Sequence, residues 1–133
     1  MAIEILVIDD NAIVVKGLRS AAESRRISNA VDTERRASIM ASLEDCHFLE
    51  KTIDTMTHGI NWASDDGRRE ATVTGYGHGG SPLRAFGDDR CDIMEEILKE
   101  KVLPIFKQRG YTCKVARYSF ASKEKYFEIK ISW

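Results

Sequence analysis

The last strand-like run of the chain, KYFEIKISW, alternates strictly between apolar and more polar positions. The apolar positions are Phe127, Ile129, Ile131 and Trp133, and the positions between them are Tyr126, Glu128, Lys130 and Ser132. A period of two is typical of a β-strand with one covered face and one wetter face. The run before it, YTCKVARYSF, is also strand-like, and the polar residues 121–124 separate the two runs. We therefore expect a C-terminal β-hairpin.

A second hairpin is predicted at the N-terminus. Residues 2–8, AIEILVI, form a nearly continuous β-branched run, and residues 12–18, AIVVKGL, return to the same composition. Asp9-Asp10-Asn11 between them is rich in turn residues, and Asn11 is best suited to a left-handed conformation. Two such runs joined by a short loop favour antiparallel pairing.

The stretch ILVIDDN is also similar to the start of a phosphoacceptor receiver domain, in which a hydrophobic strand precedes paired aspartates. Such a domain has a helix after the aspartates, a phosphoaccepting aspartate after a buried strand, and a lysine before a proline. Here β-type residues follow Asp10, Asp54 lies in a segment of helical spacing, and Lys107 comes after Pro104. Because the resemblance covers only ILVIDDN, we assign no family from it.

Two segments have the apolar spacing of three and four that predicts amphipathic helices. The first segment predicts one helix of about 25 residues that begins near Asp32, after a polar connection at residues 20–29. Its apolar stripe is Ile39, Leu43, Cys46, Leu49, Ile53, Met56 and Ile60. The stripe of the second is Met94, Ile97, Leu98, Val102, Ile105 and Phe106. Asp89 is its expected cap, Gly110 its expected end, and Pro104 predicts a kink or an earlier end.

Residues 63–88 lie between the two helical segments. They hold a short strand-like run, ATVTGY, and a Gly-rich stretch, GYGHGGSP, that is too loose for regular structure. The order of elements predicts an α+β fold: an antiparallel sheet of about four strands, made of the N-terminal and C-terminal hairpins, with two helices packed on one face. We expect a single domain over residues 1–133, with 63–88 as a Gly-rich loop insertion between the helices.

Charge and cysteine usage limit the class of protein. The net charge of −1 gives no general attraction to nucleic acid or to a membrane surface. No apolar run reaches the roughly 18 residues of a membrane span, and the N-terminus lacks a secretory pattern. The cysteines, Cys46, Cys91 and Cys113, are odd in number and widely spaced, as expected of reduced thiols in a cytoplasmic protein.

Metal binding and catalysis have little support in the sequence. Acidic helical positions similar to the facing carboxylates of small Mg²⁺-dependent nucleotide pyrophosphohydrolases are Glu44, Asp45, Glu50, Asp92, Glu95 and Glu96. Carboxylates are suitable Mg²⁺ ligands, but the paired-glutamate spacing of that family is absent here. The cysteines and histidines have neither Cys-x-x-Cys nor paired-His spacing. The sequence therefore predicts no metal and no cofactor.

Two sets of residues are candidates for binding. Arginines favour bidentate contacts with phosphate or carboxylate, and with the Gly-rich loop they predict a ligand site. Its candidates are Arg25, Arg26, Arg35, Arg36, Tyr76, His78, Arg84 and Arg90. The candidates for an interaction face on the C-terminal hairpin are Tyr118, Tyr126, Lys114 and Lys130. Such a face suits a protein partner or stacked bases, although the slightly acidic chain disfavours nucleic acid.

These features favour a small, non-catalytic binding protein of the regulator or inhibitor type that phages and mobile elements carry. We expect it to act through protein–protein contacts, with itself as a homo-oligomer or with another protein, because one sheet face is neither fully polar nor fully apolar. The alternative is a binder of a nucleotide or another phosphorylated ligand through the arginines and the Gly-rich loop. A Mg²⁺-dependent nucleotide hydrolase is the third hypothesis.

Overall fold

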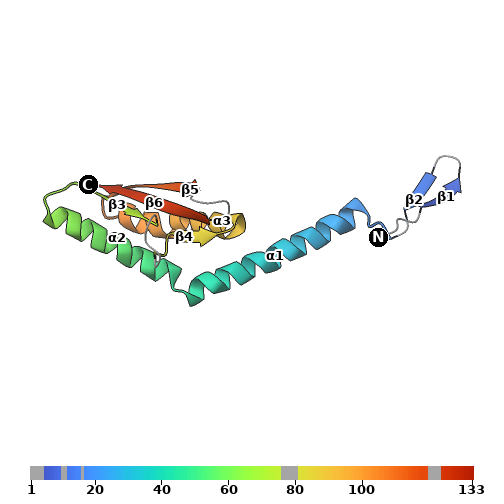
Figure 1. Ribbon diagram of the computed structural model, residues 1–133, viewed down its shortest axis with the longest axis horizontal. Coiled ribbons are helices and arrows are strands. Elements are labelled where there is room, and N and C mark those ends of the chain that lie inside the picture. The colour runs from blue at the N-terminus through green and yellow to red at the C-terminus, as the bar shows by residue number, and fades with distance from the viewer. Residues whose placement is uncertain (1–4, 10–11, 16, 76–80, 120–123) are drawn as a thin grey trace. The chain divides into compact units, whose positions relative to one another are not determined.

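A computed structural model describes residues 5–9, 12–15, 17–75, 81–119 and 124–133. The chain divides into two compact units, Met1–Arg35 and Arg36–Trp133. Figure 1 shows the helices and strands in chain order. The expectation of one domain over the whole chain, with a loop insertion at 63–88, stays a prediction.

The first unit contains the N-terminal hairpin. Strands β1 (Ile5–Asp9) and β2 (Ala12–Val15) pair antiparallel, as predicted. The turn expected at Asp10 and Asn11 lies outside the described residues. The two strands form a sheet of their own, so the prediction that this hairpin supplies half of the four-stranded sheet is wrong.

Helix α1 (Ala21–Asp45) starts eleven residues before the predicted position near Asp32, so the polar connection expected at 20–29 is wrong. The Oγ of Ser20 accepts a hydrogen bond of 3.1 Å from the backbone N–H of Glu23. Ser20-x-x-Glu23 has the spacing of a capping box, in which a hydroxyl satisfies a free N–H at the first turn. This local signal outweighs the polar composition of the segment.

The predicted first helix is two helices. Helix α1 ends at Asp45, and α2 (Phe48–Asp65) begins after a turn at Cys46-His47. His47 has a left-handed backbone with φ 56°, which ends the hydrogen-bond ladder of α1. The apolar spacing of three and four continues across this turn, so periodicity alone could not reveal the break.

A four-stranded antiparallel sheet forms the centre of the second unit, and the α+β class is confirmed. Its strands are β3 (Glu70–Thr74), β4 (Arg84–Phe86), β5 (Thr112–Ser119) and β6 (Glu124–Ser132). Residues Lys125–Ser132 of β6 pair with the whole of β5, and the other edge of β6 pairs with β3 and β4 one after the other. The predicted C-terminal hairpin is confirmed, and so is the short strand predicted at ATVTGY.

Helical structure continues past Pro104, so of the two predicted outcomes the helix end near Leu103 is wrong, and the kink stays a prediction. Helix α3 (Asp88–Ile97) passes through a π-helical turn, η1 (Leu98–Val102), into α4 (Leu103–Lys107). Pro104 has no N–H to donate inside this continuous helical segment, and the π-helical turn lies directly before α4. The first residue of the helix is Asp88 and Gly87 occupies the N-cap position, so the cap is not the expected Asp89. Gly110 follows the helix with φ 95°, as its predicted role requires.

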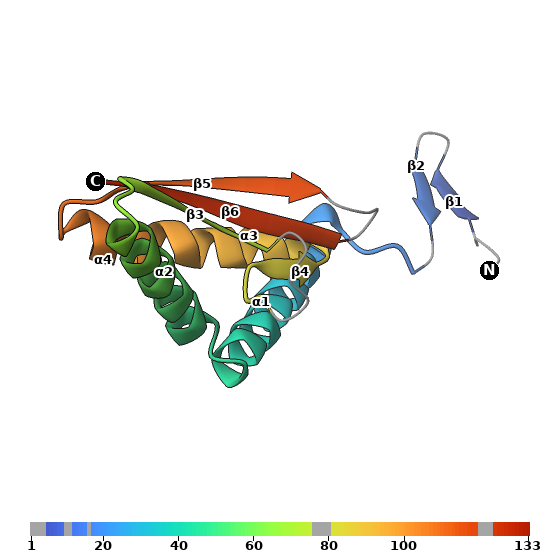
Figure 2. The same cartoon turned by 60° about the vertical axis from the view of Figure 1, so that its left-hand side comes forward.

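The core of the second unit lies on one side of the sheet. Figure 2 shows α2 and the α3–α4 segment on that same side. The largest fully buried side chains are Phe127, Met56, Leu83, Met94, Leu98, Ile129, Ile131 and Val102. Thr52 is also fully buried, and its hydroxyl has no hydrogen-bond partner among the described residues. No helix in the described part of the chain has both the length and the apolar character to cross a membrane.

Candidate interaction face and basic hollow

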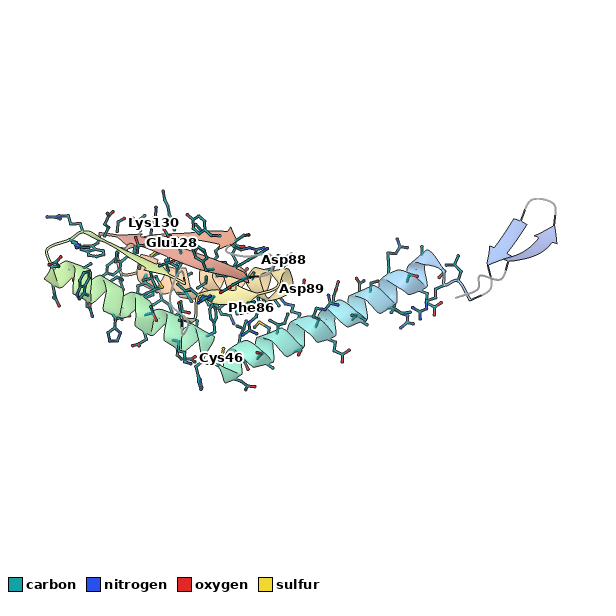
Figure 3. The ribbon with its side chains drawn as sticks, viewed as in Figure 1. Cys46, Phe86, Asp88, Asp89, Glu128 and Lys130 are labelled. Carbon is teal, nitrogen blue, oxygen red and sulfur yellow. The ribbon has the colours of Figure 1, made fainter. Side chains whose placement is uncertain are left out.

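The sheet has a second face, opposite the core, which we call the open face. Its positions alternate with the buried ones, and all are exposed or half-buried. They are Thr112, Lys114, Ala116 and Tyr118 of β5; Glu124, Tyr126, Glu128, Lys130 and Ser132 of β6; Glu70, Thr72 and Thr74 of β3; and Arg84 and Phe86 of β4. Figure 3 labels Glu128 and Lys130 on this sheet, with α2 on its other side. The four residues predicted for an interaction face therefore share one surface.

One end of the open face is aromatic. Tyr118 and Tyr126 are directly opposite each other on β5 and β6, and their rings stack with centroids 5.3 Å apart and planes inclined by 22°. Phe86 of β4 has 67% of its surface exposed, and Tyr118 has 41%. Sequence reasoning missed Phe86, because it lies in a three-residue strand inside the predicted loop. Three residues are too few to show a period of two, so no local signal could have placed Phe86 on this face.

The other end of the open face is basic. Lys114 and Lys130 are directly opposite each other, and two like charges at such positions destabilise a sheet. Lys130 has Glu128 of the same strand as an acidic neighbour, with 4.0 Å between the ammonium nitrogen and a carboxylate oxygen. A shallow hollow of about 360 Å³ lies beside the two lysines, and Glu70 is among its other lining residues. This end can therefore accept a group that supplies negative charge or a π-face.

On the core side, four acidic residues of α3, Asp88, Asp92, Glu95 and Glu96, are in ion pairs. The Arg117 guanidinium is 2.6 Å from a carboxylate oxygen of Asp92 and 3.4 Å from one of Glu95. The hydrogen bond that Arg117 donates to Asp92 raises the pKa of Arg117, and the hydrogen bond that Lys125 donates to Asp88 lowers the pKa of Asp88. Within the described residues, no group of three or more acidic, cysteine or histidine side chains has the geometry of a metal site.

The arginines predicted for a ligand site are spread over several places. Arg25, Arg26 and Arg35 lie on α1 in the first unit, and Arg25 and Arg35 are about 15 Å apart along the helix axis at 1.5 Å per residue. In the second unit, Arg36 makes two hydrogen bonds of 2.8 Å to the Glu96 carboxylate, which ties α1 to α3. Arg84 pairs with Glu124 on the open face. Tyr76 and His78, the candidates in the Gly-rich loop, lie outside the described residues.

Arg84 and Arg90 do line one hollow of about 200 Å³, which we call the basic hollow. Its lining residues are Leu43, Cys46, Phe48, Lys51, Ser81, Pro82, Arg84, Arg90 and Met94. The Arg90 guanidinium donates a hydrogen bond of 3.0 Å to the Ser42 hydroxyl and lies 4.0 Å from the Cys46 sulfur. Sequence reasoning missed Lys51, which belongs to no motif, and Ser81, which lies in the stretch GYGHGGSP but was not chosen there.

Comparison of the chain with protein-family models, with curated proteins and with solved structures finds no match. The fold and the surfaces described above therefore carry the functional argument.

Proposed function

We propose that this chain is a non-catalytic binding protein that self-associates through the open face of its sheet. The observation that carries the proposal is the aromatic end of that face. Phe86 and Tyr118 present large apolar surfaces to solvent, and the rigid stacked pair of Tyr118 and Tyr126 loses little conformational freedom on binding. Aromatic residues are enriched in protein interfaces and among the residues that dominate their binding energy.

A second copy of the chain suits this face because the face is self-complementary. In an interface with two-fold symmetry, the patch at one end of a copy contacts the patch at the other end of its partner. Two copies whose β6 strands run in opposite directions would place the aromatic end of each over the lysine end of the other. Lys114 and Lys130 could then lie against tyrosine rings in cation–π contacts. Glu128, between the two ends, already has Lys130 of its own chain beside it.

The size of the face limits the strength of this association. Strand β6 has nine residues, which span roughly 30 Å at about 3.3 Å per residue. Three strands side by side, about 4.8 Å apart, give a width of roughly 15 Å with their side chains. The area of roughly 450 Å² is well below the roughly 800 Å² per partner of a standard stable interface. We therefore expect a weak, concentration-dependent dimer with a Kd on the order of 10 µM or higher.

Sedimentation velocity on the full chain, from about 5 to about 500 µM, tests the proposal across the range in which such a dimer forms. Tyr118→Ser and Phe86→Ser should each weaken association at least about tenfold, since each removes an aromatic side chain from the contact. Trp62→Ser is the matched control, because Trp62 is 64% exposed on α2, away from the open face. A monomer at every concentration, or equal weakening by Trp62→Ser, would refute the proposal.

A further inference from the structure

The basic hollow has an unusual balance of charge. Three of the nine described residues that line it are cationic, namely Lys51, Arg84 and Arg90, and none of these nine is acidic. The three come from separate elements, α2, β4 and α3, so the fold brings them to one place. Because the charge of Arg84 is compensated by Glu124, the remaining positive charge belongs to Lys51 and Arg90.

Neither of these two cations has an acidic partner in the described part of the chain. Arg90 donates only to neutral acceptors, the hydroxyl of Ser42 and the sulfur of Cys46. These contacts hold the guanidinium in place without neutralising it, and they leave most of its five N–H donors available. A positioned guanidinium with its charge uncompensated is well suited to a phosphate group.

The rest of the lining is suited to the non-phosphate part of a small molecule. Leu43, Phe48, Pro82 and Met94 supply apolar surface, and the hydroxyl of Ser81 is an additional donor or acceptor. A volume of about 200 Å³ is below the roughly 300 Å³ at which pockets for drug-sized ligands begin. The hollow therefore has room for a phosphate and a few further heavy atoms.

We propose that the basic hollow binds a small phosphate monoester, with Lys51 and Arg90 as the groups that contact the phosphate. A phosphate monoester carries about −1.5 to −2 charges at pH 7, which matches the two uncompensated cations. The apolar lining contacts the organic part and so distinguishes a monoester from inorganic phosphate. Arg84 belongs both to this lining and to the open face, where it is opposite Tyr126, but Lys51 and Arg90 lie on the helices α2 and α3, and phosphate binding by these two residues does not depend on self-association.

Isothermal titration of the full chain with phenyl phosphate and with inorganic phosphate tests the site. The wild-type chain should bind phenyl phosphate more tightly than inorganic phosphate. Lys51→Gln and Arg90→Gln should each weaken phenyl phosphate binding at least about tenfold, the usual loss for one charge-assisted contact. Lys51→Arg should retain binding, because it keeps the charge in place. Circular dichroism establishes that each variant is folded.

Lys101→Gln and Arg109→Gln are the matched controls, since both residues are exposed and neither lines the basic hollow. The controls should change the affinity less than about twofold, as expected for distant surface charges screened by salt. Equal loss in the controls would mean general attraction of anions and would overturn the proposal. No heat of binding with wild-type chain at millimolar phenyl phosphate would also overturn it. Tyr118→Ser should bind as wild type does, which separates this test from the test of self-association.

Discussion

Gly75 is the position at which a single methyl group should do the most damage to the second unit. A Cβ at this position would lie 2.6 Å from the backbone oxygen of Leu83 and 2.8 Å from its carbonyl carbon. Gly75 donates its N–H to the oxygen of Phe127 at 3.1 Å, and Phe127 donates its own N–H to the oxygen of Leu83 at 2.8 Å. The methyl of Gly75→Ala would thus press on the carbonyl that joins β4 to β6.

The cost of Gly75→Ala follows from two effects. Forcing an extra methyl into a packed site costs about 1 to 3 kcal/mol, and backbone is the least able to move away. Displacing the Leu83 carbonyl weakens its hydrogen bond from Phe127, which contributes about 1 kcal/mol. Phe127 is fully buried, so the sheet has little freedom to relax there. We expect destabilisation of about 2 to 4 kcal/mol, and a Tm at least about 10 °C lower for a unit of about 100 residues.

Urea unfolding followed by tryptophan fluorescence measures this change. Both tryptophans, Trp62 and Trp133, lie in the second unit, so the signal reports on that unit. Gly59→Ala is the matched control: its Cβ would lie 3.3 Å from a methyl of Val73, a side-chain atom that can move. Because Gly59 is inside α2, alanine there should leave stability unchanged or add up to about 1 kcal/mol. A Gly75→Ala variant within about 0.5 kcal/mol of wild type would refute the reasoning.

Three further predictions concern stability and reactivity. Thr52→Val should stabilise the chain by about 1 kcal/mol in urea unfolding, because it removes a buried hydroxyl that has no hydrogen-bond partner among the described residues. A loss of stability would contradict this prediction. Burial raises the pKa of the Cys91 and Cys113 thiols. A thiol reagent at pH 8 should therefore modify the exposed Cys46 quickly and the other two cysteines only on unfolding. Rapid modification of all three thiols would contradict the burial of Cys91 and Cys113. The hydrogen bond and charge of its lysine partner lower the pKa of Asp88, so its contribution to stability is present above about pH 4 and is lost as the pH falls. Asp88→Asn should therefore be less stable than wild type at pH 7, with a difference that shrinks on acidification; a constant difference across pH would argue against the ion pair.

The C-terminal hairpin could be predicted from sequence because its signal is local. Phe127, Ile129 and Ile131 occupy one face of β6 and are all buried, as the period of two requires. The same alternation predicted Tyr118 and Tyr126 on one face, and the pairing register of β5 and β6, which sets the two residues directly opposite each other, confirms this prediction. Trp133 is the exception: it is 37% exposed and packs edge-on against Tyr111, since it lies beyond the last residue of the strand.

The composition of the sheet could not be predicted, because strand pairing depends on contacts between distant residues. The N-terminal segment has the stronger β composition, yet β3 and β4 from the predicted loop complete the sheet. Strand β4 has three residues, too few to show a period. It is held in place by pairing with Glu124–Tyr126 and by the hydrogen bond between Phe127 and Leu83. Neither interaction can be recognised from the sequence of β4 itself.

The candidate sites were partly predictable for the same reason. Lys114 and Lys130 share a face because alternation fixes the direction of strand side chains. Arg84 and Arg90 were chosen for their chemistry, and the fold brings both to the basic hollow. Lys51 could not be chosen, because it lies on α2, far from both in sequence, and only the turn at His47 directs that helix toward them.

Disulfide trapping between two different variants tests the two-copy arrangement most directly. In a background that carries Cys46→Ser, Tyr118→Cys and Lys114→Cys would be placed in separate chains and then mixed under mild oxidation. Opposed β6 strands in a two-fold dimer place β5 over β5 and bring position 118 of one copy next to position 114 of the other, so the mixture should give a cross-linked dimer and each variant alone should give much less. A mixture that cross-links no better than one in which Trp62→Cys replaces Tyr118→Cys would contradict self-association through the open face.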